Sequence, residues 1–199
     1  MNVVRRSFVA GAVALAALGL AGAAHAQSKA KYSARIGHLE SPQQPRHQAL
    51  MKVVELVRAR TNGEVEMQIF PSSQLGNARQ MIEATQLGTN EGTVMPAAFL
   101  GGFNPAVSVL DIPYLLPSDR AAAQRLRGGA FGQAILDSFA ARGFVALTLW
   151  PNGRKSLSSN KPLDSLEAMK GQKFRVMDSK ILIEQFAAVK HDIEALKQG

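Results

Sequence analysis

The sequence predicts an α/β fold with a mainly parallel sheet. Two successive strand, helix, strand units occupy the first half of the chain, and a continuous β-rich run follows at residues 144–150. Strands separated by helices of this length need crossover connections, which place parallel strands in one sheet with helices on its faces.

The first unit begins with a strand predicted at residues 32–39, which a Ser-Pro break at 41–42 separates from a helix. The alternation of apolar and acidic or amide residues over 65–69 then has the period of a half-buried strand, which Pro71 ends. Apolar residues of the intervening helix recur at spacings of three and four, namely Ala49, Leu50, Val53, Val54 and Val57.

The second unit has a helix that Gly76 opens and Gly88 ends, followed by a short strand at 93–95. Beyond it the sequence predicts an extended apolar segment at 110–114. Two helices are expected next, at 121–126 and 131–139. The run at 144–150, bounded by Gly143 and Pro151, is predicted to be a strand buried on both faces.

Arg175 is the candidate anion-binding residue that this pattern indicates. A short helix is predicted after Asp164, with Gly171 as its exit, and the alternation over 173–176 then places Lys173 and Arg175 on the same side of a strand. Ligands of open α/β sheets bind outside the carboxyl ends of the strands, so a guanidinium there suits a binding crevice. The pattern alone favours an exposed arginine in a surface ion pair.

Residues 1–26 are predicted to be a secretory signal peptide. Arg5 and Arg6 precede an apolar run at 8–21, which is too short for a membrane span, and the segment ends in Ala-His-Ala at 24–26. Cleavage is expected after Ala26, and the chain is expected to reach the periplasm. The paired arginines leave both the general secretory route and the twin-arginine route open.

Composition narrows the class of partner. The formal net charge is +8, of which the predicted signal contributes two arginines and no acid, leaving about +6 for the remainder. Small organic anions fit this charge, whereas nucleic acid does not, because the basic residues are scattered rather than interleaved with aromatic ones. The sequence has no cysteine, so a thiolate metal site and a cysteine nucleophile are excluded.

Catalytic and metal-binding motifs are absent from the sequence. No nucleophile-elbow, zinc-protease or phosphate-loop motif is present, so we predict no enzyme activity and no cofactor, with an exported hydrolase as a remote alternative. His38, His47 and His191 lack metal-ligand spacing. Glu40, close to His38, is interpreted as either a polar pocket contact or, in preference, a loop residue.

Four strings resemble the receptor proteins of tripartite ATP-independent periplasmic (TRAP) transporters, in the dicarboxylate-type family, and they fall in the order that the family shows. The resemblance extends over roughly residues 32 to 190. The strings are Arg60–Gly63 with Phe70–Gly76, Leu110–Tyr114, Ser159–Leu163 and Met169–Val176.

The resemblance implies a periplasmic solute-binding fold of two α/β lobes, which bind a small organic acid for an ion-driven membrane permease and do not catalyse. It places Arg175 on the arginine that pairs with the ligand carboxylate. It also implies a basic residue after the Asn152-Gly153 pair, where Arg154 stands one position early and Lys155 is in register, so either could face the ligand. Trp150 beside this turn is a core residue or a pocket-lining one.

The same comparison predicts lobe I at residues 27–150 and a partial lobe II at 151–199. A strand expected after the helix through Phe186 is missing at 190–192, so the second lobe is expected to be incomplete and the chain a truncated member of the family. The expected form is a monomer. The alternative reading is a gene fragment that binds nothing, and the ligand itself is not identified by the sequence.

Overall fold

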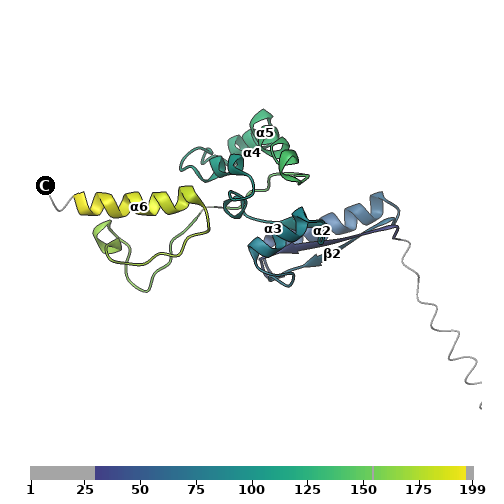
Figure 1. The fold of residues 1–199 in the computed structure, drawn as a ribbon, viewed down its shortest axis with the longest axis horizontal. Coiled ribbons are helices and arrows are strands. Elements are labelled where there is room, and N and C mark those ends of the chain that lie inside the picture. The colour runs from purple at the N-terminus through teal and green to yellow at the C-terminus, as the bar shows by residue number, and fades with distance from the viewer. Residues whose placement is uncertain (1–29, 154, 196–199) are drawn as a thin grey trace, which may run out of the picture.

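The computed structural model describes residues 30–153 and 155–195. The predicted signal peptide, its cleavage site and Arg154 lie outside the described residues. Three groups of elements follow one another along the long axis: a sheet with two helices, a helical segment around residues 97–143, and a C-terminal helix with the loop that precedes it (Figure 1). The expected α/β fold with a parallel sheet is confirmed.

The sheet has three parallel strands in the order β2-β1-β3, namely β1 at Tyr32–His38, β2 at Val65–Phe70 and β3 at Gly92–Val94. Ile36 of β1 pairs with Ile69 on one side and with Gly92 on the other. β1 is therefore the central strand: the first crossover runs from β1 to β2, and the second returns from β2 across β1 to β3. The strands predicted at 32–39 and 65–69 match β1 and β2 closely.

Two helices connect these strands, α2 at Pro45–Arg60 and α3 at Ala78–Gln86. The start of α3 is set by a capping box in which Asn77 accepts from the Gln80 backbone N–H and Gln80 accepts from the Asn77 backbone N–H. Leu50 of α2 and Met81 and Ile82 of α3 are buried. Through these apolar side chains α2 and α3 pack against the rest of the domain.

The middle segment consists of 3₁₀-helices and two short α-helices. They are η1 at Ala97–Phe99, η2 at Pro105–Asp111, α4 at Arg120–Gly128, α5 at Ala130–Asp137 and η3 at Ala140–Arg142. Val107, Ile135 and Phe139 form its buried centre, and Phe139 meets Phe144 edge to face at 6.0 Å. The extended segment predicted at 110–114 is only partly correct, because its first two residues lie in η2.

The strand predicted at 144–150 is wrong as a buried strand. Phe144, Ala146 and Leu149 pack on the cluster around Phe139, but Val145 and Leu147 are 87% and 85% exposed. Within the described chain no strand pairs with this segment. The sequence pattern reports a β preference, but a strand buried on both faces also needs neighbouring strands and a second layer.

The last group contains the 3₁₀-helix η4 at Glu167–Met169 and the helix α6 at Lys180–Ala195. Gly171 has φ 69° after η4, the left-handed exit that the sequence predicts. Residues 172–177 are not paired in a sheet. Their exposure still alternates as the sequence predicts, with Phe174 and Val176 half-buried and the basic residues at 173 and 175 exposed. Phe174 packs on Phe186 of α6, with ring centroids 5.4 Å apart.

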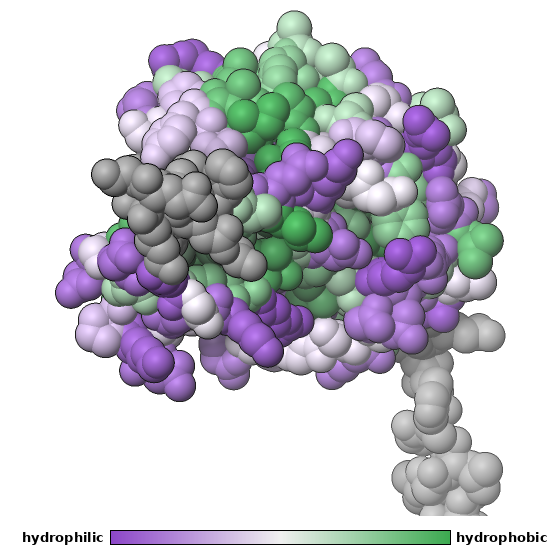
Figure 2. Space-filling model, turned by 60° about the vertical axis from the view of Figure 1, so that its left-hand side comes forward, coloured by the Kyte–Doolittle hydropathy of each residue, from purple (hydrophilic) through white to green (hydrophobic). Residues whose placement is uncertain are grey.

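Apolar surface lies among hydrophilic side chains on the face that Figure 2 turns forward. Several large apolar side chains are exposed in the second half of the chain, and Tyr114 is fully exposed. Among the described residues no helix is both long enough and apolar enough to cross a membrane.

Candidate functional site

A cluster of polar side chains lies at the carboxyl end of the central strand. His38 is the last residue of β1 and is fully buried, and its Nδ1 lies 3.1 Å from Oε2 of Glu40 in the following loop. The Glu40 side chain is 20% exposed, so its carboxylate is partly shielded yet reachable from outside. In a sheet of order 2-1-3, ligands bind outside the carboxyl ends of β1 and β3, where the strand order reverses.

Arg46 extends this cluster toward the second half of the chain. It lies in the first turn of α2, and its guanidinium donates to Glu40 Oε1 through Nη1 and to Asn152 Oδ1 through Nη2. Asn152 is 106 positions away in the sequence. The structure thus brings one of the predicted ligand residues next to the polar end of β1.

A second histidine closes the cluster on its buried side. His47 Nδ1 lies 3.0 Å from His38 Nε2, and one of these two nitrogens must donate while the other accepts. Burial lowers the pKa of His38, with Glu40 opposing and His47 adding to the shift. His38 is therefore held neutral at the pH where a free histidine begins to protonate.

Asp111 is the centre of a second polar group, at the end of η2. Its side chain is only 4% exposed and accepts from Lys155 Nζ at 2.7 Å and from Ser179 Oγ at 2.8 Å. Gln185 Nε2 donates to the backbone oxygen of Asp111 at 2.9 Å. One buried carboxylate therefore joins the middle segment to Lys155 and to the start of α6.

Arg175 is exposed in the extended segment before α6. Within the part of the chain that the structure describes, no hydrogen bond or ion pair engages its guanidinium, and none joins it to either polar cluster. The surface ion pair that the pattern alone allowed is not formed among these residues. Trp150, the remaining predicted residue with a described position, is half-buried.

The predicted site residues thus fall into three places. Asn152 joins the cluster at the end of β1, Lys155 is bound by Asp111, and Arg175 stands apart with its charge unneutralised by the described chain. Sequence reasoning missed Arg46 and Asp111, and it favoured a plain loop role for Glu40. The signal that could have found Glu40 and Arg46 is their position just after the carboxyl end of the first strand.

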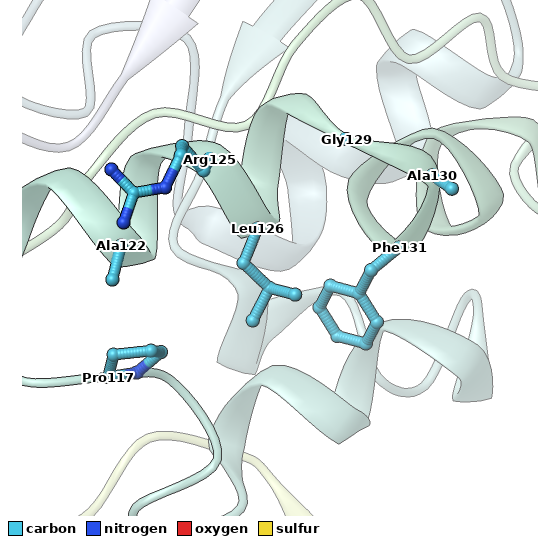
Figure 3. A pocket seen from close by; sticks show the side chains of 7 residues that line it. All are labelled: Pro117, Ala122, Arg125, Leu126, Gly129, Ala130 and Phe131. Atoms are coloured by element: carbon cyan, nitrogen blue, oxygen red, sulfur yellow. The ribbon is translucent and has the colours of Figure 1, made fainter.

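An open apolar depression of about 490 Å³ lies between α4, α5 and the loop before them (Figure 3). Leu126 and Phe131 project into it opposite Pro117, and none of the predicted ligand residues lines it. Its lining is mainly apolar, and Arg125 is the charged residue among those that line it. In the described ranges no three histidine, aspartate or glutamate side chains are grouped to hold a metal ion.

Residues 36–198 match the model of the bacterial extracellular solute-binding proteins, family 7. The chain belongs to this family. It is 32% identical to the C4-dicarboxylate-binding periplasmic protein DctP of Rhodobacter capsulatus over 159 residues, which are 78% of this chain and 46% of that protein. It is also 32% identical to the 2,3-diketo-L-gulonate-binding periplasmic protein YiaO of Escherichia coli K12, over 80% of this chain and 48% of the relative.

Solved structures of TRAP periplasmic solute-binding proteins show the same fold. A TRAP periplasmic solute-binding protein of Desulfovibrio salexigens with bound orotic acid is 69% identical, with a TM-score of 0.78 over 80% of this chain and 51% of that one. A second, from Sulfurospirillum deleyianum with bound succinate, is 33% identical, with a TM-score of 0.74 over 81% and 52%. This chain is a TRAP-type family 7 sequence that spans about half the length of the relatives it matches.

Proposed function

We propose that this chain acts as a periplasmic receptor that captures a small organic acid for a TRAP-type membrane permease. The match to family 7 over residues 36–198 carries the proposal. The family consists of periplasmic solute-binding receptors, and we extend this to a chain that binds without catalysing, functions as a monomer and loses residues 1–26 on export. Residues 27–150 and 151–199 would then supply the two sides of the binding site.

Orotic acid is the ligand we propose to test first, because it is bound in the structure with 69% identity. In this proposal Arg175 grips the carboxylate, since a planar guanidinium meets both carboxylate oxygens at once. Its exposure and the absence of a partner for it in the described chain support that role.

The turn at 150–155 supplies the other proposed contacts. Asn152 contributes its amide, and Trp150 forms a wall beside the turn. Arg154 is the basic residue that we propose to face the ligand, because the Lys155 amine already neutralises Asp111. Lys155 then orients the turn rather than holding the carboxylate.

A thermal-shift panel of organic acids tests this function. Orotate, succinate, malate, galacturonate and 2,3-diketogulonate would each be added to the purified chain, with glucose as an uncharged control. A ligand at about 100 times its Kd stabilises the native state by about 2.7 kcal/mol, which raises Tm by several degrees. A cooperative melt that none of these acids shifts would contradict the proposed function.

A further inference from the structure

We propose that Glu40, Arg46 and Asn152 form a specificity subsite that reads uncharged polar groups of the acid. It would favour a monocarboxylate that also carries amide-type N–H and C=O groups over a dicarboxylate of similar size. The inference rests on the proposed function and adds to it the class of acid that this end of the site accepts.

The charge of the subsite is the first argument. Glu40 contributes a carboxylate and Arg46 a guanidinium that is already paired with it, so the two formal charges cancel. With Arg154 assigned to the carboxylate that Arg175 holds, a second ligand carboxylate placed here would meet the Glu40 carboxylate and, among the described residues of the subsite, no cation beyond Arg46, so Coulomb repulsion and loss of hydration oppose its binding.

The orientation of the Asn152 amide is the second argument. A guanidinium only donates hydrogen bonds, so the amide atom facing Arg46 must be the oxygen, as the structure shows. The Nδ2 group of Asn152 then points elsewhere, and no partner for it occurs in the described ranges. Because Asn152 is exposed, this N–H₂ is a fixed donor available to a ligand carbonyl.

The Glu40 carboxylate supplies the matching acceptor. Its two oxygens are held by Arg46 and by His38, but a carboxylate has about four lone-pair positions, so capacity remains. Its side chain is 20% exposed, which leaves access from outside. Arg46 holds both side chains, so the Asn152 donor and the Glu40 acceptor belong to one cluster and complement a ligand that carries both C=O and N–H groups, as a cyclic imide or amide does.

Calorimetric titration with orotate and with succinate tests the subsite. Wild type is compared with Glu40→Gln and Asn152→Ala. Glu55→Gln serves as the matched control, because it removes a carboxylate that makes only an exposed ion pair with Lys52 within helix α2. We expect both subsite variants to weaken orotate binding at least about tenfold, the effect of losing one buried hydrogen bond at about 1.4 kcal/mol. Glu40→Gln should also lower the orotate-to-succinate affinity ratio, since it removes the repelling charge.

The outcomes separate this inference from the function it rests on. If wild type binds orotate and both variants keep the wild-type ratio of orotate to succinate affinity, the subsite is wrong while the receptor function stands. If wild type binds succinate and not orotate, the subsite is also wrong. Should Glu40→Gln fail to fold, Asn152→Ala alone decides, because Asn152 is exposed. No binding of either acid to folded wild type would instead count against the receptor function.

Discussion

Replacing Asp111 by alanine should be among the most damaging single polar substitutions in this chain. The Asp111 side chain is 4% exposed and is the shared acceptor for Lys155 and Ser179. Alanine removes the carboxylate and offers no other acceptor. The Lys155 amine and the Ser179 hydroxyl must then bind water or remain unpaired. The loss in free energy of unfolding depends on how much water each of these two donors can reach.

The two donors differ in that respect. Ser179 is buried, so its hydroxyl loses its partner where solvent is scarce, which costs about 1–3 kcal/mol. The Lys155 side chain is 49% exposed and recovers most of its hydration, so its contribution is below about 1 kcal/mol. We therefore expect Asp111→Ala to lower the free energy of unfolding by about 1–4 kcal/mol, or roughly 2–16 °C in Tm.

Urea denaturation followed by circular dichroism measures this cost. Glu55→Ala is the control, because the Glu55 side chain is 65% exposed in its pair with Lys52 and should cost less than about 0.5 kcal/mol. The double variant Asp111→Ala/Ser179→Ala should cost less than the sum of the two single variants, since both remove the same hydrogen bond. The role of Asp111 as shared acceptor would be refuted if the free energy of unfolding of Asp111→Ala lay within about 0.5 kcal/mol of the wild-type value. It would also be refuted if the double variant lost the full sum of the two single losses.

Three further predictions concern the sheet and its helices. Asn77→Ala removes the capping box of α3 and should cost about 1 kcal/mol in urea denaturation; an unchanged midpoint would show that the cap contributes nothing. Gly37→Ala places a Cβ 2.6 Å from Met81 Sδ and should lower Tm by an amount equivalent to about 1–3 kcal/mol; an equal or higher Tm would mean that Met81 simply moves aside. Because burial lowers the pKa of His38 below 6.5, the unfolded chain takes up this proton first, so stability should fall as pH drops below about 6.5. His38→Gln should flatten that dependence in urea melts, and an unaltered slope would exclude His38 as its source.

The first half of the fold could be predicted well from the sequence because local signals and tertiary structure agree there. The period-two run at 65–69 and the three-and-four spacing around Leu50 each fit the element that formed, β2 and α2. At 144–150 the local signal was as strong, yet no described strand pairs with it. A strand depends on its neighbours, and a single sequence does not reveal whether they are in place.

The candidate site was harder to predict because its contacts join distant positions. Asn152 pairs with Arg46 across 106 positions, and Asp111 meets Ser179 across 68. Neither spacing leaves a local pattern. The alternation around Arg175 did predict its exposed face correctly, whereas its role as a carboxylate partner stays a prediction.

The most direct test of the receptor proposal is calorimetric titration of orotate into wild type, Arg175→Ala and Lys173→Ala. Lys173 is the matched control, since it is an exposed basic residue on the same side of the same segment. Two charge-assisted hydrogen bonds of about 1.5–3 kcal/mol each predict a loss of about 100-fold or more for Arg175→Ala. Lys173→Ala should bind like wild type. Equal orotate affinity in wild type and Arg175→Ala would contradict the account.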